Sequence, residues 1–217
     1  MLFSQAMEPL SQRIIKTIHI WIAAFLMLLA AAIFLFTHEK AAGYKLLVPY
    51  HNPTLDVVVS WFTYVGDGIF VLVCAVVLFV YKQKRLALIV VVSFLLSGLL
   101  VQIPKNLIDA ARPALYFQGL GQPFHIIPDV TLTASHASFP SGHTATVFAF
   151  MSCLVLMFPK SKWNGVWLLV AIAVAYSRLF VGNHFLVDVL VGAIIGMFST
   201  FLTYYVVFRT VQKKSIK

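Results

Sequence analysis

Long apolar segments limit the possible folds of this sequence more than any other feature. A membrane-spanning helix needs about 20 mostly apolar residues, because the hydrocarbon core of a bilayer is about 30 Å thick. Only 11% of the residues are charged, whereas a soluble domain carries about 25% because water must wet its surface. The composition therefore indicates an integral membrane protein. Its six apolar segments are residues 18–36, 57–81, 86–103, 142–158, 166–177 and 185–208.

The predicted fold is an all-α bundle of six membrane helices in a single domain, residues 1–217. The first segment exceeds the roughly 7–15 apolar residues of a secretory signal, so we expect it to be retained. Gly66, Asp67 and Gly68 interrupt the second segment and should separate a short interfacial helix from a span of about residues 69–81. Whether they form a simple bend or approach a functional site stays open. The longest polar interval, residues 104–140, is expected to form a non-cytoplasmic lid.

The basic residues support a cytoplasmic N-terminus. With that topology, 11 of the 16 lysines and arginines fall on the cytoplasmic side, as the positive-inside rule requires. They are Arg13, Lys16, Lys82, Lys84, Arg85, Lys160, Lys162, Arg209, Lys213, Lys214 and Lys217. The other five are Lys40, Lys45, Lys105, Arg112 and Arg178. The last three lie beside apolar segments on the opposite side and need a functional explanation.

Composition also excludes other classes of protein. The formal net charge of +9 does not indicate nucleic-acid binding, because the cations lie in short loops and form no continuous basic surface. Cys74 and Cys153 lie inside apolar segments, without the spacing of a zinc site or a redox pair. We interpret both cysteines as small buried hydrophobic residues. The bilayer is therefore the expected partner of the chain's surface.

The first segment with possible chemistry contains Lys105, Arg112 and Pro113. A spacing of seven residues is about two helical turns, so the two cations can share one face of a helix. Pro113 discourages further helix and should begin a loop. A structural alternative is that both cations extend to the membrane interface for solvation.

The second segment is Pro140-Ser141-Gly142-His143, directly before the fourth apolar segment. Serine is a preferred helix N-cap, and glycine permits close approach of the backbone. The free amides at such a helix end bind anions. The alternative is a plain cap with an interfacial histidine.

The third segment contains Ser177, Arg178, His184 and Asp188. On a helix, residues four apart are neighbours, so Asp188 can bind one ring nitrogen of His184 and leave the other free to attack. An acidic side chain just inside a membrane span, such as that of Asp188, costs free energy, which favours a functional role for it. The alternative is a structural His–Asp pair within the bundle.

The three segments fall on the same side of the membrane in this topology. Lys105, Arg112 and Arg178 could bind the peripheral oxygens of a phosphoryl group. Backbone amides near Ser141 and Gly142 would assist them. The combination therefore predicts a phosphate site.

Two histidines complete this predicted site. His184 would attack phosphorus, with Asp188 orienting its ring. His143 would protonate the departing oxygen. The predicted reaction is therefore transfer of a phosphoryl group to His184.

The three segments resemble the signature motifs of the type 2 phosphatidic acid phosphatase superfamily. Every spacing within the motifs matches, and chance agreement with all three in order is improbable. The likeness covers residues 105–188, and the six-span plan extends it over nearly the whole chain. The matching residues are Lys105, Arg112, Pro113, Pro140, Ser141, Gly142, His143, Ser177, Arg178, His184 and Asp188.

This resemblance implies an enzyme with a phosphohistidine intermediate on His184. It also implies that Asp188 acts in a charge relay and that His143 acts first as an acid and later as a base for water. No metal and no cofactor are implied, and the sequence has no carboxylate cluster near the motifs for a two-metal site. The substrate should be an amphiphilic lipid phosphate, such as phosphatidylglycerol phosphate, phosphatidate, an isoprenyl diphosphate or a lipid A phosphate.

Other functions remain as alternatives. A phosphotransferase would pass the phosphoryl group from His184 to a lipid acceptor instead of water. A transporter is a different class, but transporters place polar sites near the midplane and contain internal repeats, and neither is apparent here. An inactive structural protein is disfavoured because every reacting residue is present. The superfamily also includes vanadate-binding haloperoxidases, but these are soluble proteins, and the six predicted spans argue against that branch.

Several single residues have weaker interpretations. Asp109 lies four residues after Lys105 and could form an ion pair with it. His125 and His136 are interpreted as solvated loop residues, with contact to a lipid headgroup as the alternative. Gly192 and Gly196 form a small-x-x-x-small pattern that favours close helix packing or formation of a homo-oligomer. Short loops and compact size favour a bacterial cytoplasmic membrane, with the site on the periplasmic or extracellular face.

Overall fold

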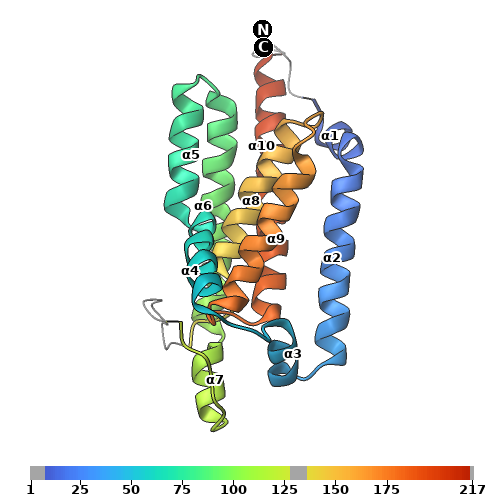
Figure 1. Cartoon of the computed structure of the whole chain (residues 1–217). Helices are drawn as coiled ribbons and strands as arrows, with labels where there is room; N and C mark the ends of the chain where they lie inside the picture. Colours follow the sequence, from blue (N-terminus) through green and yellow to red (C-terminus); the bar gives the residue numbers. More distant parts are fainter. Residues whose placement is uncertain (1–7, 128–135, 216–217) are drawn as a thin grey trace.

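The computed structural model describes residues 8–127 and 136–215 and confirms the all-α fold class. Within these two ranges every element longer than an isolated bridge is a helix (Figure 1). The elements are α1 (Leu10–Lys16), α2 (Ile18–Thr37), α3 (Lys40–Leu47), α4 (Pro53–Phe62), the 3-10 helix η1 (Thr63–Gly66), α5 (Gly68–Val80), α6 (Lys84–Leu107), α7 (Pro113–Gly119), α8 (Gly142–Met157), α9 (Asn164–Phe180) and α10 (Leu186–Ser215).

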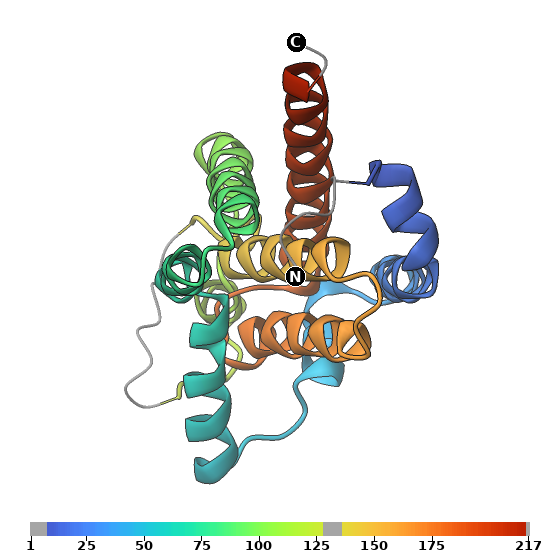
Figure 2. The same ribbon diagram turned by 90° about the horizontal axis from the view of Figure 1, so that it is seen from above.

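Helix α8 is the centre of the bundle. It packs against α6, α9 and α10, and the view along the bundle shows it between them (Figure 2). Most of its side chains are buried, and its sequence is apolar on all sides rather than on one face. A helix of this kind belongs in the interior of a bundle.

The two ends of the bundle are formed by different elements. Both termini and α1 lie at one end, whereas α3 and α7 lie at the opposite end (Figure 1). Helices α6 and α9 end, and α8 and α10 begin, toward the end that carries α3 and α7. The three predicted motifs occupy these helix ends. The connectivity of the helices therefore brings together segments that are far apart in the sequence.

Among the described residues, three helices are long and apolar enough to cross a membrane: α2, α6 and the Leu186–Phe208 part of α10. The α4–η1 segment and α5 meet at an angle of 53° and would together form a fourth, broken span. Helices α8 and α9 are apolar but shorter, with 16 and 17 residues. All six predicted apolar segments are thus helical, and the number that cross the bilayer stays a prediction.

The outer surface of the bundle is suited to lipid. Large apolar side chains are exposed on the outer helices, for example Phe25 on α2, Val76 on α5 and Phe198 on α10. A water-soluble monomer rarely exposes such extensive apolar surface. Together with the candidate spans, this surface identifies an integral membrane protein.

Gly192 and Gly196 pack α10 against α8 within one chain. A Cβ atom on Gly192 would lie 2.6 Å from the carbonyl oxygen of Ser141, and one on Gly196 would collide with the carbonyl of Ala145. The predicted close packing is therefore intramolecular. Formation of a homo-oligomer stays a prediction, but these two glycines do not provide its surface.

The N-terminal helix is attached to the end of α8. The guanidinium of Arg13 is buried and donates hydrogen bonds from Nη1 to the carbonyls of Leu156 and Met157, at 2.7 and 3.1 Å. A cation at a helix C-terminus satisfies carbonyls that lack intrahelical partners and interacts favourably with the helix dipole. Arg13 therefore has a structural role beside its contribution to topology.

The two cysteines are both free thiols. Cys153 is buried, with its Sγ 3.5 Å from Ser93 Oγ and 3.6 Å from Thr200 Oγ1. Cys74 is only partly buried. The prediction of a small buried residue is therefore confirmed for Cys153 and holds only in part for Cys74.

The polar interval of residues 104–140 contains more helix than the sequence predicted. Helix α6 continues through Pro104 to Leu107, and α7 begins at Pro113. The expectation that Pro113 would discourage helix was wrong, because proline is favoured at the first helical position, where the missing N–H has no intrahelical partner. The predicted lid includes residues 128–135, which lie outside the described residues.

Candidate active site

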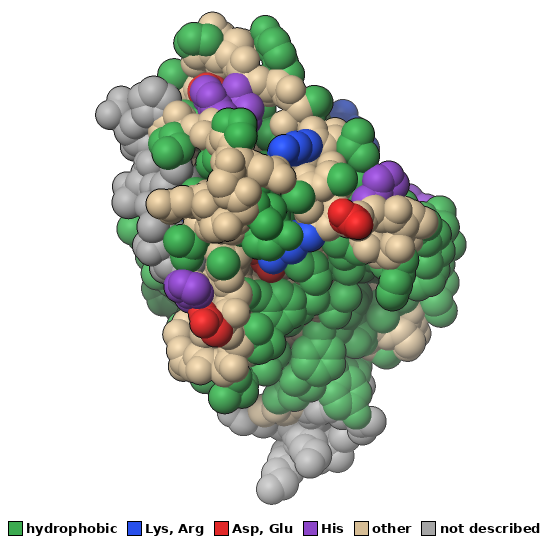
Figure 3. Space-filling model, turned by 90° about the horizontal axis from the view of Figure 1, so that it is seen from below, with side chains coloured by type: hydrophobic (Ala, Val, Ile, Leu, Met, Phe, Trp, Pro, Cys, Tyr) green, Lys and Arg blue, Asp and Glu red, His purple; other side chains and the backbone are tan. Residues whose placement is uncertain are grey.

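The three predicted motifs meet at the end of the bundle opposite the termini. The positive charges of Arg112 and Arg178 act on both His143 and His184, and Lys105 interacts with both arginines. Figure 3 views the molecule from this end and shows basic, acidic and histidine side chains among hydrophobic ones. The structure therefore brings all five side chains into one electrostatic environment, although they come from three different parts of the sequence.

His184 and Asp188 face each other at the start of α10. The Nδ1 atom of His184 lies 3.5 Å from Oδ2 of Asp188, and both side chains are buried. This contact is longer than an ordinary hydrogen bond, as catalytic contacts often are in structures without substrate. The predicted pairing is present, but not on one helical face: His184 lies in the turn before α10, which begins at Leu186.

Burial keeps His184 neutral. Loss of water around the ring lowers the pKa of His184 to about 4, and the nearby charges of Arg178 and Arg112 act in the same direction. The interaction with Asp188 opposes this shift but does not overcome it. An imidazole that is neutral at pH 7 has a free lone pair, which a nucleophile needs.

Asp188 has further partners that the sequence analysis missed. Its Oδ2 accepts hydrogen bonds from Ser138 Oγ at 2.5 Å and from the backbone N–H of Phe185 at 2.9 Å. Ser138 is positioned by backbone hydrogen bonds that join residues 136–138 to Ala110. These bonds orient the carboxylate behind the histidine. Sequence spacing gives no sign of this contact, which joins residues 50 positions apart.

Arg112 reaches the site from the segment after α6. Its Nη1 donates to Oδ1 of Asn183 at 2.8 Å, directly beside His184. The predicted shared helical face with Lys105 is wrong, because α6 ends at Leu107 and Ile108 is extended. Both cations still enter the same environment, since the chain turns back there instead of continuing as a helix.

Lys105 lies at the last turn of α6. Its Nζ donates to the carbonyl of Ala137 at 2.9 Å, one residue before Ser138. The predicted ion pair between Lys105 and Asp109 is not the one formed: Asp109 pairs with His136, 2.8 Å away, on the exposed surface. The two residues lie on either side of the point where helix α6 ends, so the four-residue spacing no longer places them together.

Arg178 is the most buried cation of the site, with 6% of its surface exposed. Its Nη1 donates to Thr63 Oγ1 of η1 at 2.6 Å. The Nε atoms of Arg112 and Arg178 are buried, and neither has a hydrogen-bond partner among the described residues. Buried charged donors without partners are costly. These nitrogens therefore suit an anionic ligand.

His143 lies on the first turn of α8, near Asp67. Its Nε2 is 3.7 Å from Oδ2 of Asp67, whose Oδ1 caps α5 by accepting from Ile69 N. A Cβ atom on Gly66 would lie 3.1 Å from the carbonyl oxygen of His143. The Gly66-Asp67-Gly68 segment thus forms the bend between η1 and α5 and also approaches the site, which resolves the two alternatives that the sequence left open.

Ser141 forms the N-cap of α8, as predicted. Its Oγ accepts a hydrogen bond from Thr144 N at 3.4 Å, and its own N–H donates to the backbone carbonyl of Asp188. Gly142 follows as the first helical residue. The cap fixes the start of α8 against the start of α10. Anion binding by the amides near Ser141 and Gly142 stays a prediction.

Lys40 is a further cation near the site that the sequence left unexplained. Its Nζ lies 4.1 Å from the ring centroid of Phe185 and 4.6 Å from that of Tyr116. Partial burial lowers the pKa of Lys40, and the negative charge of Asp188 opposes that shift. Lys40 therefore lies within electrostatic range of the His184–Asp188 pair. Its position on α3 could not be related to the motifs from sequence.

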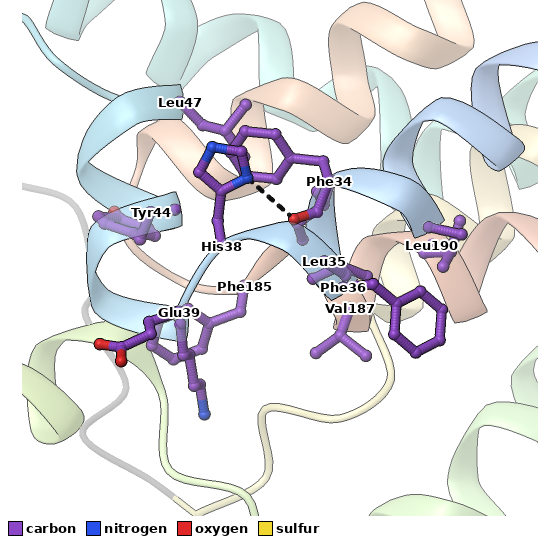
Figure 4. Close-up of a pocket in the computed structure, with 14 residues that line it drawn as sticks. Phe34, Leu35, Phe36, His38, Glu39, Tyr44, Leu47, Phe185, Val187 and Leu190 are labelled. Atoms are coloured by element: carbon purple, nitrogen blue, oxygen red, sulfur yellow. Dashed lines mark hydrogen bonds between the residues drawn. The ribbon is translucent and has the colours of Figure 1, made fainter.

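An apolar cavity of about 450 Å³ adjoins this cation. Figure 4 shows its lining, which comes from the end of α2, from α3 and from the start of α10. Lys40 and Phe185 are both among its lining residues, and Phe185 directly follows His184 in the chain. The other apolar side chains that define it include Phe34, Phe36, Tyr44, Leu47 and Leu190.

A second group of polar residues joins the start of α4 to the segment after α7. Asp56 Oδ1 is 2.9 Å from His51 Nδ1, and Asp56 Oδ2 is 3.0 Å from His125 Nε2. His125 is about half exposed in a loop, as interpreted, but it also pairs with Asp56 because the segment after α7 folds back onto α4. His136 is largely exposed, in agreement with its interpretation, although it pairs with Asp109. The His51–Asp56–His125 group shares no residue with the motifs.

Comparison with known proteins gives a family for this arrangement. The family model described as the PAP2 superfamily matches residues 86–212. A lipid A 1-phosphatase of Rhizobium etli is 32% identical over 176 residues, which are 81% of this chain and 63% of that protein. The chain thus spans less than two thirds of that relative's length. Phosphatidylglycerophosphatase B of Bacillus subtilis is 29% identical over 82% of this chain and 89% of its own length.

A solved structure also resembles the chain. The crystal structure of Aquifex aeolicus LpxE aligns with a TM-score of 0.60 and 28% sequence identity. The alignment covers 74% of this chain and 91% of that one. The helical arrangement described above is therefore shared with a solved protein.

Proposed function

The chain belongs to the PAP2 superfamily, and from this premise we propose that it is a membrane lipid phosphatase that works through a phosphohistidine on His184. The observation that carries the proposal is the position of His184: a buried, neutral imidazole with Asp188 on one side and the charges of Arg112 and Arg178 nearby. A nucleophile, an orienting carboxylate and anion-binding cations are the parts that phosphoryl transfer to histidine needs.

In the first step, Nε2 of His184 attacks phosphorus while Nδ1 remains directed at Asp188. Lys105, Arg112 and Arg178 bind the peripheral phosphoryl oxygens and stabilise the charge that builds up on them. The P–N bond forms as the bond from phosphorus to the departing oxygen breaks. His143 donates a proton to that oxygen.

In the second step, water replaces the histidine. His143, now deprotonated, accepts a proton from water as the water oxygen attacks phosphorus. The P–N bond breaks, inorganic phosphate leaves and His184 returns to its neutral form. Asp67, near His143, is suited to orient the ring of that histidine through both steps.

The proposed reaction uses no metal at the phosphate site. The cations that neutralise the phosphoryl group are side chains of the protein itself, and histidine already supplies the nucleophile. Within residues 8–127 and 136–215, the phosphate-site residues include no group of three ligands whose donor atoms converge. Chelators should therefore leave the chemical step unaffected.

The substrate is proposed to be a lipid with a phosphomonoester or diphosphate group. The cavity that Phe185 helps to line (Figure 4) has a volume of about 450 Å³ and a mostly apolar lining, which suit part of an acyl chain. Lys40, in the same lining, is suited to a further negative charge of the headgroup. The names of the relatives support lipid A phosphates and phosphatidylglycerol phosphate as the first compounds to test.

We place the active site on the non-cytoplasmic face of a bacterial cytoplasmic membrane. The chain would act as one domain with six spans, in which α8 and α9 cross with help from flanking residues and α4–η1 with α5 forms one broken span. The cations in the connections at the opposite end support this orientation. Bacterial relatives support the membrane of residence.

A phosphate-release assay tests the function. The purified chain in detergent is given phosphatidylglycerol phosphate, phosphatidate, an isoprenyl diphosphate and lipid A, without an added acceptor. Release of inorganic phosphate should require no divalent ion and should be inhibited by vanadate. The His184→Ala variant should lose essentially all activity, which for removal of a nucleophile means a fall in kcat of about 10⁴-fold or more.

The outcome distinguishes the alternatives. A stable acid-labile phosphoenzyme without phosphate release would support a phosphotransferase, in which a lipid acceptor replaces water. Activity that survives His184→Ala would exclude the proposed nucleophile. A variant with the same burial, such as Cys153→Ala, provides the control for folding because Cys153 lies deep in the bundle and has no role in the reaction.

A further inference from the structure

Two imidazoles and one carboxylate converge at a place that the proposed reaction does not use. His51 lies before the N-cap of α4, Asp56 lies in the first turn of α4, and His125 follows α7. One donor atom of each residue lies within 4.8 Å of the other two. The group joins residues 69 positions apart, so folding, and not local sequence, produces it.

The charge balance of this group is unusual. Asp56 is 5% exposed, and a buried carboxylate normally needs a positive partner. Its ion-pair partners among the described residues are the two histidines, and no lysine or arginine contacts it. The negative charge therefore lacks a permanent cation.

The donor atoms have the chemistry and the spacing of a transition-metal site. Neutral imidazole nitrogens and a carboxylate oxygen are typical ligands of Zn²⁺, with bonds of about 2.0–2.2 Å. Tetrahedral geometry then places neighbouring donor atoms about 3.3 Å apart. His51 Nδ1 lies 2.9 Å from Asp56 Oδ1, and His125 Nε2 lies 3.0 Å from Asp56 Oδ2. One donor atom of each residue already lies within 4.8 Å of the other two, so small side-chain movements would let the three converge on one ion.

Neighbouring residues hold the ligands in position. The ring of His51 lies between those of His125 and Phe180, with centroid separations of 4.2 and 4.4 Å. Asn52 caps α4 by accepting a hydrogen bond from Leu55 N at 2.8 Å, which fixes the turn that carries His51 and Asp56. Ligands that are already positioned lose little conformational entropy when they bind a metal.

We propose that His51, Asp56 and His125 bind one Zn²⁺ ion, with water at the fourth position. Three protein ligands and one open position are common for zinc, and the side chain of His125, 48% exposed, provides access for the ion. The bound ion would join the start of α4 to the segment after α7, across the end of α9. Its role is to stabilise the outer end of the bundle.

Metal binding to the full chain tests this proposal directly. The protein is purified in detergent with an affinity tag that contains no histidine, treated with chelator and then titrated with Zn²⁺. Bound metal is measured by mass spectrometry and by competition with a fluorescent zinc indicator. About one Zn²⁺ should bind per chain. Co²⁺ in its place should give the visible absorption of a four-coordinate site.

Substitutions of the proposed ligands test whether the ion binds to the His51–Asp56–His125 group. Asp56→Asn keeps the size of the side chain, and His125→Ala removes a half-exposed ring, so the second variant should fold even if the first does not. Each should weaken Zn²⁺ binding by at least about tenfold, because even the loss of an outer partner of a zinc ligand costs 10–100-fold. His136→Ala is the matched control: it removes an exposed histidine from the same loop and should bind Zn²⁺ like the wild type.

Thermal unfolding provides a second measurement. A ligand that binds only the folded state raises the unfolding midpoint, so Zn²⁺ should raise that of the wild type and of His136→Ala but not that of His125→Ala. Absence of stoichiometric binding to the wild type would overturn the proposal and leave the group as a hydrogen-bonded network. Equal binding by His125→Ala would overturn it as well. Because neither readout uses phosphatase activity, failure here would leave the proposed reaction untouched.

Discussion

At the scale of single residues, the site combines a neutral nucleophile with several fixed positive charges. His184 avoids protonation because it is buried and because Arg178 and Arg112 lie nearby. Asp188 holds the ring nevertheless, supported by Ser138 and the N–H of Phe185. The same cations that would bind phosphate thus also keep the attacking nitrogen free of its proton.

The first prediction concerns pH. The pKa of His184 is about 4 in the folded protein and near 6.5 in the unfolded chain. Below pH 6.5 the unfolded state therefore binds more protons, so the stability that the neutral ring contributes is fully present above about pH 6.5 and is lost as pH falls toward 4. The thermal midpoint of the wild type should fall more steeply over this range than that of His184→Gln, which cannot titrate there.

If the thermal midpoints of the wild type and of His184→Gln fell equally with pH, His184 would not be the source of the pH dependence. In the same range, protonation of His184 should cause no fall in kcat/KM of the wild type until the pH approaches 4, because the free enzyme retains the unprotonated nucleophile. An acid limb with a midpoint near 6.5 would indicate an ordinary, solvated histidine.

The second prediction concerns Ser138 as a positioning residue for Asp188. Ser138→Ala removes the 2.5 Å hydrogen bond to Asp188 Oδ2 and should lower kcat by about 10–100-fold with little change in KM, as loss of a supporting contact does at comparable sites. Steady-state kinetics measures both constants. In an Asp188→Asn background the same change should have little further effect, because the two residues act as a unit. If the fold reductions in kcat of the two single variants multiplied in the double variant, Ser138 would not act through Asp188.

At the scale of helices, the contact between α8 and α10 determines whether the motifs can meet. Helix α8 carries His143 at its first turn, and α10 carries Asp188 at its own. Gly192 and Gly196 allow the two backbones to approach closely, which small residues do generally in membrane bundles. The hydrogen bond from Ser141 N to the carbonyl of Asp188 then aligns the two helix starts.

A prediction at this scale follows for Gly196→Ala. The added Cβ would lie 2.8 Å from Ala149 N and would collide with the Ala145 carbonyl. Backbone atoms cannot move aside, so the free energy of unfolding should fall by about 1–3 kcal/mol, as in overpacked cores. Thermal unfolding in detergent measures the change.

Gly98→Ala is the control for this substitution. Gly98 lies inside α6, and a Cβ there would meet nothing within 4 Å. The higher helix propensity of alanine should leave stability unchanged or increase it by up to about 1 kcal/mol. If both variants were equally stable, close contact between α8 and α10 would not be needed.

At the scale of the whole molecule, the bundle separates two kinds of polar end. The end that carries α1 also holds the α5–α6 and α8–α9 connections, whose cations are predicted to be cytoplasmic, and Arg13 there caps α8. The opposite end carries the candidate site, the apolar cavity and the His51–Asp56–His125 group. Lipid substrates can reach such a site from the bilayer because their tails remain in an apolar phase throughout.

The orientation of the molecule can be tested by labelling. In a background in which Cys74 and Cys153 are replaced by alanine, Gln118→Cys on α7 should react with a membrane-impermeant thiol reagent in intact cells. Lys162→Cys, in the connection between α8 and α9, should react only after permeabilisation. The reverse pattern would place the site in the cytoplasm and would contradict the proposed topology. Both positions are exposed, so reactivity reports on the side of the membrane and not on burial.

The all-α membrane class, the six helical segments and the identity of the residues that meet at the site could all be predicted from the amino-acid sequence. This was possible because apolar segments of sufficient length must be helical in lipid, and because charges that violate the positive-inside rule need a reason to be there. Local features that depend only on adjacent residues were also predicted correctly, for example the helix N-cap at Ser141.

The hydrogen-bond partners of these residues could not be predicted from the sequence, because they depend on how the helices pack. Ser138 beside Asp188, Asn183 beside Arg112 and His125 beside Asp56 are contacts across 50 to 71 positions, and no periodicity relates such pairs. They form because close packing of α8 with α10, and the folding back of the segments after α6 and α7, fix which backbone ends adjoin. Periodicity records which face of a helix is apolar, whereas the choice of a polar partner depends on packing in three dimensions.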